Sequence, residues 1–244
     1  MKKFVFNGER SDDFGLHIDE PKIYDTQGRR YDFTAVPARH GEYIQGDATY
    51  NTVSASYPVS IVAQCRDDLT KKIEAVREWL NDSKGYCRLE DDYAIDEYRM
   101  AVYADATQWE VLYGQYAKSN IVFRCMPQRW LKSGERAVHI TGTGTTPLVN
   151  PTRSTAHPII MVKGTGSVIV GDATIKVNRN TGTITIDCER MTIRDANGGD
   201  VDSNVEVSCR GTKHIFPSLP RGTTEVSYNG AISSVVVIPR WWHA

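Results

Sequence analysis

Apolar residues between positions 67 and 81 recur with the spacing of an α-helix. The positions at i, i+4, i+7 and i+11 are Leu69, Ile73, Val76 and Leu80. This spacing places all four side chains on one face. The pattern predicts one main helix over Asp67–Asn81, capped by Asp67 or Asp68 and ended before Gly85.

Short runs of β-branched and aromatic residues flank this helix and indicate strands. They are Lys3–Phe6, Tyr57–Val62, Tyr98–Tyr103 and Asn120–Cys125. The first part of the chain therefore reads as an α+β domain, with one helix packed on a β-sheet. His40–Ala55 is polar, contains glycines and has no sustained apolar face. We expect this segment to be a long loop or a projecting hairpin that contacts something.

The chain after Pro151 has another pattern, in which Thr, Val and Ile dominate and helix formers are scarce. Its short apolar runs are Pro158–Val162, Ser167–Val170, Ala173–Val177, Thr183–Asp187, Met191–Arg194, Val205–Cys209, Thr224–Tyr228 and Ser233–Ile238. Turn residues separate the runs, including Gly171-Asp172 and Asn229-Gly230. Strands at this spacing predict an all-β sandwich or jelly roll.

The composition changes over Lys132–Pro151, which mixes Gly, Thr and Pro with little apolar periodicity. We therefore expect a first domain over residues 1–135, a linker over 136–150 and a β-sandwich over 151–244. The fold class predicted for the whole chain is mainly β.

Length and charge narrow the function classes. The chain has 244 residues, with 29 Lys+Arg against 30 Asp+Glu and a formal net charge of -1, so it lacks the basic surplus of a dedicated DNA binder. No apolar stretch has the length of a membrane span, and the start predicts neither a signal peptide nor an anchor. The five cysteines are dispersed, which favours reduced thiols and a reducing compartment for folding.

The sequence contains no motif that predicts catalysis or a cofactor. It lacks a GxSxG elbow, a Walker A sequence, an H-E-x-x-H pair and a GxGxxG that opens a helix. The six histidines lie apart from one another, without the spacing of a metal set. We expect no catalytic residue, no metal ligand and no bound cofactor.

Two acidic stretches were weighed as sites and interpreted as structural. LEDDYAIDEY holds Glu90, Asp91, Asp92, Asp96 and Glu97. Solvated charges before a strand explain it without any convergent geometry. DANGGDVDSN loosely resembles a calcium loop, but its glycines precede the carboxylates and no Glu closes a twelve-residue frame. A turn rich in Asx hydrogen bonds is the preferred interpretation, and Ca²⁺ binding there stays open.

Several stretches together resemble one protein family in the same order along nearly the whole chain. They are FNGERSDDFGLHI, VPARHGEYIQGDATYNTVSASYPVSI, VREWLNDSKGYCRLEDDY, FRCMPQRWLKSGE, NPTRSTAHPIIMVKGTG, ITIDCE, FPSLPRGTTEV and the final IPRWW. The family is the distal tail proteins, called Dit, of bacteriophages with long, non-contractile tails. Ala38 stands where the family's Val-Pro-Gly-Arg-x-Gly element has a glycine, while Arg39 and Gly41 match it.

The resemblance implies a structural role in the virion. In this family the first domain builds a hexameric ring and the second is a galectin-like sandwich on the outside of the ring. Such a ring joins the tail tube and tape measure proteins to the tail-associated tip protein and, in some phages, to a receptor-binding protein. Its lumen lets DNA pass. The implied protein is no enzyme, has no membrane anchor, assembles in the host bacterial cytoplasm and becomes part of the tail tip or baseplate.

Two sets of candidate contact residues follow. Four residues in or beside the loop segment are hypothesised to form the subunit interface, because Arg and Tyr commonly anchor interfaces: Arg39, Tyr43, Tyr50 and Asn51. The alternative function is a carbohydrate-binding adhesion module that contacts host cell-wall glycans through Tyr228, Trp241 or Trp242, although packing is the preferred interpretation of the two tryptophans. Two further functions are less favoured for this chain: a tail-associated hydrolase, and another ring-forming tail component such as a tube subunit.

Overall fold

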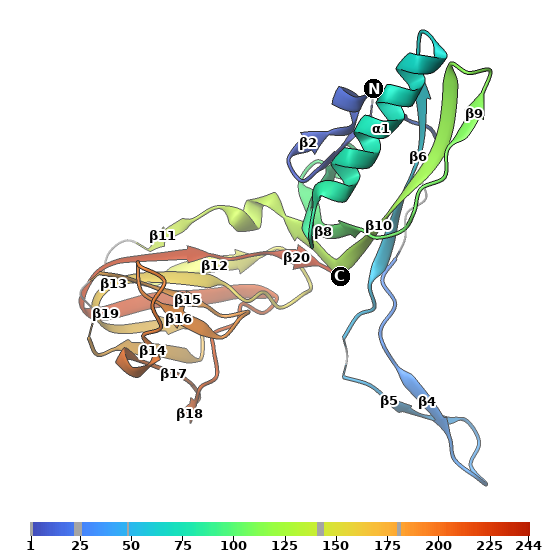
Figure 1. The fold of residues 1–244 in the computed structure, drawn as a ribbon. Coiled ribbons are helices and arrows are strands. Elements are labelled where there is room, and N and C mark those ends of the chain that lie inside the picture. The colour runs from blue at the N-terminus through green and yellow to red at the C-terminus, as the bar shows by residue number, and fades with distance from the viewer. Residues whose placement is uncertain (1, 22–25, 48, 141–143, 180–181) are drawn as a thin grey trace. The chain divides into compact units, whose positions relative to one another are not determined.

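The structure is a computed structural model that describes residues 2–21, 26–47, 49–140, 144–179 and 182–244. The chain divides into two compact units, Met1–Arg129 and Trp130–Ala244 (Figure 1). Strands form most of the regular structure, and the described residues contain one α-helix. The predicted mainly-β class is therefore confirmed.

A β-sheet and the helix make up the body of the first unit. The sheet has the strand order β2-β1-β7-β8-β10-β6-β3, with β9 beside β10. Its strands are β1 (Phe4–Phe6), β2 (Glu9–Arg10), β3 (Leu16–Ile18), β6 (Val53–Val62), β7 (Cys87–Asp91), β8 (Glu97–Tyr103), β9 (Glu110–Leu112) and β10 (Tyr116–Leu131). A short 3₁₀ helix, η1 (Ser11–Phe14), joins β2 to β3.

Helix α1 (Arg66–Asp82) extends one residue beyond the predicted helix at each end. Its buried side chains are Leu69, Val76, Trp79 and Leu80, so Trp79 widens the predicted apolar face. Asp68 accepts a hydrogen bond of 3.1 Å from the Gln64 backbone N–H, while Cys65 is the N-cap residue and makes no side-chain cap bond. The carboxylate therefore ties the preceding chain to the first helical turn.

Aromatic rings join the helix to the sheet. Trp79 stacks on Phe14 with ring centroids 4.4 Å apart, and Phe4 lies 5.7 Å from Trp79 on the sheet side. Phe6 and Phe123 approach to 4.8 Å inside the same core. Because buried aromatic pairs combine large apolar area with a preferred geometry, this cluster fixes α1 on the sheet.

A two-stranded hairpin leaves this sheet. We call residues 28–51 the arm: it contains β4 (Asp32–Ala35) and β5 (Glu42–Gln45), which pair only with each other among the described strands. Figure 1 shows it as a thin extension, connected to β6. At its base, the Asn51 N–H donates to Gly28 O at 3.0 Å. Sequence analysis predicted a projecting hairpin, but the first strand lies before the segment that indicated it.

The second unit is a single curled sheet with the strand order β11-β19-β13-β14-β17-β18, in which β12 pairs with β19 and β15 lies between β13 and β16. Its strands are β11 (Val138–Ile140), β12 (Thr146–Asn150), β13 (Ile159–Val170), β14 (Ala173–Val177), β15 (Thr183–Asp187), β16 (Thr192–Arg194), β17 (Val205–Cys209), β18 (Thr212–Lys213) and β19 (Gly222–Ile238). The short strand β20 (Trp242–His243) is not part of this sheet and pairs with β10. Two 3₁₀ helices are η2 (Lys132–Glu135) and η3 (Asp202–Asn204).

Two long strands, β13 and β19, run through both halves of this sheet. One half of β13 pairs with β14 and the other with β15, and a register shift lies between Lys163 and Gly164. Residues from both halves bury their side chains in one core. The sheet therefore folds over onto itself.

Glycines permit this bend. A Cβ atom on Gly164 would lie 2.3 Å from Ala231 O, and one on Gly166 would lie 2.1 Å from Asn229 O. Gly230 is paired with Gly166 and has φ +87°. The sequence predicted four short strands here, separated by turns, whereas the structure has two strands that bend at these glycines. Glycine is favoured both in turns between strands and at bends within a strand, so the sequence pattern could not distinguish the two.

The boundary between the units lies between Arg129 and Trp130, inside β10. Part of the segment expected as a linker, 136–150, forms β11 and β12, and both strands pair with β19. Residues 141–143 of that segment lie outside the described residues. Pairing with the long β19 explains why a stretch with little apolar periodicity is nevertheless strand.

Candidate interaction sites

The arm carries the four residues predicted to form a subunit interface. Arg39 closes the turn at its tip, where its N–H donates to Val36 O at 3.2 Å. Pro37 and Ala38 occupy the central positions, and Ala38 has φ +60°. Proline followed by a residue with positive φ is the arrangement of a type II turn, which favours glycine at the second position. Ala38 therefore adopts the conformation of the family's glycine at a steric cost.

The other three predicted residues lie along the arm rather than in one cluster. Tyr43 is in β5, directly opposite Thr34, and is exposed. Tyr50 and Asn51 lie at the base, where the Arg29 guanidinium carbon sits 5.1 Å from the centroid of the Tyr50 ring. The structure thus brings Tyr50 and Asn51 together and places Arg39 and Tyr43 further out.

Four apolar side chains of the arm were not predicted from the sequence as contact residues, and all are exposed: Tyr31, Phe33, Val36 and Ile44. The signal that could have found them is the alternation of apolar and polar residues over 31–35, which is the pattern of a strand with one apolar face. This strand precedes His40, where the segment predicted as a loop or hairpin begins.

The aromatic residues considered for glycan contact occupy different environments. Trp241 is 6% exposed and belongs to the core of the second unit, so its ring is not available for stacking on a sugar. Tyr228 and Trp242 are half-buried and pack against that core. The Trp242 indole N–H donates to Thr155 O at 2.9 Å, and its ring lies 6.4 Å from that of Trp130.

The end of β19 is anchored by a charged cluster. Arg240 Nη1 lies 3.0 Å from Asp187 Oδ1, and its guanidinium carbon lies 5.5 Å from the Trp130 ring centroid. Burial raises the pKa of the neighbouring Cys188 thiol to about 12, with a smaller contribution from Asp187. All five cysteines are free thiols.

Carboxylates in the two acidic stretches hold backbone turns. Asp91 Oδ1 accepts hydrogen bonds of 3.0 Å from the N–H groups of Tyr93 and Ala94. Asp195 Oδ1 likewise accepts from Asn197 and Gly199, at 2.9 and 2.7 Å. Across the part of the chain that the structure describes, no group of three or more His, Cys, Asp or Glu side chains is arranged to hold a metal ion.

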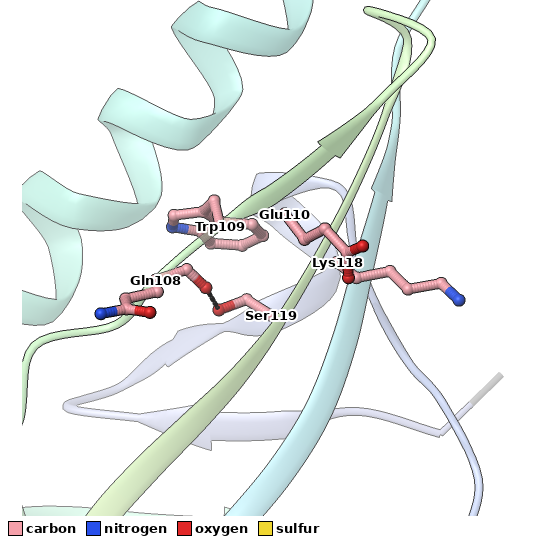
Figure 2. A pocket seen from close by; sticks show the side chains of 5 residues that line it. All are labelled: Gln108, Trp109, Glu110, Lys118 and Ser119. Atoms are coloured by element: carbon pink, nitrogen blue, oxygen red, sulfur yellow. Dashed lines mark hydrogen bonds between the residues drawn. The ribbon is translucent and has the colours of Figure 1, made fainter.

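An open depression of about 360 Å³ lies beside β9 and β10 (Figure 2). It is lined by Gln108, Trp109, Glu110, Lys118 and Ser119. Ser119 Oγ donates to Gln108 O at 2.6 Å, so the hydroxyl fixes the edge of the depression. Its described lining has neither a histidine nor a thiol. A second depression, of about 530 Å³, lies at the arm and is lined by Arg30, Asp32, Gln45, Gly46 and Asp47.

Comparison with known proteins shows which family and which solved structures this chain resembles. The profile of the phage tail protein RIFT-related domain family matches residues 10–125, which span the arm and most of the first unit. No curated protein matches the sequence. No helix in the described ranges has the length and apolar character needed to cross a membrane.

A solved structure shares the fold over nearly the whole length of the chain. The Dit protein of phage SPP1, described as a paradigm of the hub adsorption apparatus in phages that infect Gram-positive bacteria, matches with a TM-score of 0.75 and 15% identity. That match covers 97% of this chain and 98% of the SPP1 protein. A chain of the phage P2 baseplate in its activated conformation with Ca covers 97% of both chains, with a TM-score of 0.48 and 7% identity.

Residues 10–125 of the first unit therefore match the phage tail RIFT-related domain, and the whole chain shares the fold of the SPP1 Dit protein. Its resemblance to the distal tail family of siphophages is confirmed, by sequence over residues 10–125 and by fold across both units.

Proposed function

We propose that this protein is a structural hub of the phage tail tip, in which six copies form a ring at the distal end of the tail tube. The ring joins the tube and tape measure proteins to the tail-associated tip protein and to receptor-binding proteins, and DNA passes through its lumen. The observation that carries this proposal is the phage tail domain over residues 10–125 within a chain that has the fold of the SPP1 Dit protein throughout.

The exposed arm is an argument for the proposed ring. A closed ring with heterologous contacts requires two different complementary surfaces on every copy. The arm supplies one of them, because each described residue from 28 to 49 is exposed and β4 and β5 pair only with each other among the described strands. Arg39 and Tyr43 project along its length, and Tyr50 and Asn51 fix its base.

Charge is consistent with a lumen for DNA. The formal net charge of -1 leaves each copy without the basic surplus that binds phosphates strongly. DNA in transit then meets walls that interact with it weakly. The function needs no chemistry, so the role proposed for the chain is structural and its location is the distal tail of the virion.

The test is the mass of the purified protein across concentration, by light scattering, with negative-stain images of the same sample. A ring of six copies has a mass of about 164 kDa, six times 27.4 kDa, and an open centre. The double variant Arg39→Ala/Tyr50→Ala is expected to weaken assembly. A protein that stays monomeric at every concentration contradicts the ring, and unchanged assembly of the double variant contradicts the role of these two residues.

A second candidate function is glycan binding by the second unit. The observation that favours it is the half-buried aromatic pair Trp130 and Trp242, whose rings lie 6.4 Å apart. Since Trp241 is in the core, a platform would use Trp242 or Tyr228. Saturable binding to host cell-wall polysaccharide that is lost in Trp242→Ala, with the fold retained, would establish this function. Binding unaffected by Trp242→Ala and by Tyr228→Ala would remove it.

A further inference from the structure

The pairing of β4 with β5 sorts the side chains of the arm into two faces. Directly opposed residues of an antiparallel pair lie on the same face, and neighbours along a strand alternate. Phe33 is opposite Ile44, whereas Thr34 is opposite Tyr43. Phe33 and Ile44 therefore share one face, and Tyr43 lies on the other.

Tyr31 joins Phe33 and Ile44 on the same face. Its ring lies 6.3 Å from that of Phe33 in an edge-to-face arrangement. A Cβ atom on Gly46 would lie 2.9 Å from Tyr31 Cδ1, so the tyrosine ring covers this glycine, which directly follows β5 and is two residues beyond Ile44. We call Tyr31, Phe33 and Ile44 the apolar face of the arm. The opposite face presents Asp32, Thr34, Tyr43 and Gln45.

The apolar face of the arm is largely exposed to solvent, and a free hairpin gains no stability from apolar side chains that stay exposed. Phe33 is 58% exposed, Ile44 56% and Tyr31 41%. A lone two-stranded hairpin is at best marginally stable in water, because it buries too little apolar surface to offset the ordering of its backbone. A contact that covers this face would supply the missing burial.

The size and charge of the arm fit a second copy of this chain as the covering partner. One side of a standard protein interface has about 20–30 residues. Residues 28–47 and 49 of the arm are all exposed, and about half of them lie on the apolar face, so this face can supply a large part of such an interface. The arm carries three arginines and three carboxylates, so it is balanced in charge. A near-neutral partner such as this chain matches that balance, whereas a polyanion such as DNA does not.

We infer that the apolar face of the arm, Tyr31 with Phe33 and Ile44, is the face that docks on a second copy of this chain, and that the Tyr43 face points away from that contact. This inference rests on the proposed ring and adds to it which face makes the contact. Tyr43 then contributes little to assembly, in contrast to its place among the residues first predicted for the interface.

Paired variants test the face. Phe33→Thr/Ile44→Thr removes apolar area and keeps residues that favour strands, while Tyr43→Thr/Gln45→Thr is the matched control on the opposite face. The apolar-face variant should raise the concentration at half assembly by about tenfold or more, and the control by less than about threefold. Since arm residues contribute nothing to either core, both variants should melt at the wild-type temperature.

A photo-crosslinker gives an independent readout on the assembled protein. With p-benzoylphenylalanine at position 33, a covalent dimer should form, and with the same group at position 43 it should not. Equal loss of assembly in both double variants, or crosslinking from position 43 alone, overturns the inference while the ring still stands. Wild-type protein that remains monomeric at all concentrations refutes the proposed ring itself, and the docking inference fails with it.

Discussion

The Tyr57 hydroxyl donates a hydrogen bond of 2.7 Å to Oδ2 of Asp91, which joins the middle of β6 to the end of β7. Tyr57 is 2% exposed, so the bond lies in the core of the first unit. The other oxygen of Asp91 holds the turn that follows β7. One carboxylate from an acidic stretch thus links the sheet core to a turn, which is a structural role.

Removing the hydroxyl should destabilise the first unit. Tyr57→Phe leaves a half-buried carboxylate oxygen of Asp91 without this donor, and hydrogen bonds to charged groups contribute about 2 kcal/mol. The midpoint of urea unfolding should fall accordingly. Tyr43→Phe is the matched control: it removes the same atom from an exposed tyrosine and should change the midpoint little. Equal effects of the two substitutions would contradict the role of the bond.

Alkaline pH should unfold the protein partly through Tyr57. Burial, and then the charge and hydrogen bond of Asp91, hold the pKa of Tyr57 well above its usual value of 10.0. Above pH 10 the unfolded chain loses this proton while the folded chain keeps it, so stability falls as pH rises. In Tyr57→Phe the fall between pH 10 and 11 should be shallower, by up to about 1.4 kcal/mol per pH unit. Identical slopes in both proteins, measured by urea unfolding, would rule this out.

Thiol reactivity should separate two cysteines. Cys65 is exposed, whereas Cys188 is buried and its pKa is raised to about 12. Because the thiolate is the nucleophile, iodoacetamide at pH 8 should modify Cys65 in the native protein and leave Cys188 intact. Peptide mapping by mass spectrometry checks both sites, and urea should make Cys188 reactive. Labelling of Cys188 without denaturant would show that the second unit opens readily.

The turn at the tip of the arm should tolerate glycine better than its own alanine. Ala38 has φ +60°, a conformation that costs an L-residue about 1 kcal/mol and glycine little. Ala38→Gly should therefore slow hydrogen exchange of the Arg39 amide, whose bond to Val36 closes the turn. Ala35→Gly, in the neighbouring strand, should speed it instead. Faster exchange in Ala38→Gly would mean that the turn differs from the type II arrangement.

The bend of the second unit should not tolerate a side chain. In Gly166→Ala the new Cβ would lie 2.1 Å from Asn229 O, a backbone atom that moves only if β19 moves. We expect the unit to lose about 3 kcal/mol of stability. Gly144→Ala is the control, since a Cβ there meets nothing within 4 Å and its stability should change by about 0.5 kcal/mol at most. Thermal unfolding followed by circular dichroism measures both.

Periodicity predicted the elements that depend on local spacing. Helix α1 was found to within one residue because Leu69 and Leu80 mark one helical face over three turns. β13 and β19 were split, because Gly164 and Gly230 act as bends only when two strands approach each other. That approach is a tertiary relation between residues far apart in the sequence.

The candidate contact residues were predictable only in part. The arm was located from its polar composition, but its apolar face depends on the register that sets Phe33 against Ile44. A change of one residue in that register would exchange the two faces. Trp241 and Trp242 have the same side chain and adjacent positions, and only packing shows that the first is in the core.

The long pairing of β13 with β19 also sets the order in which the second unit can form. Residues 159–170 pair with residues 226–238, so more than fifty residues separate the two strands along the chain. During synthesis the ribosome must release β19 before the curled sheet can close, and closing so large a loop is slow. The first unit, whose strands and helix end with β10, can fold while the second is still being translated. Newly made chains would therefore pass through a stage in which the first unit is folded and β13 is not yet paired with β19.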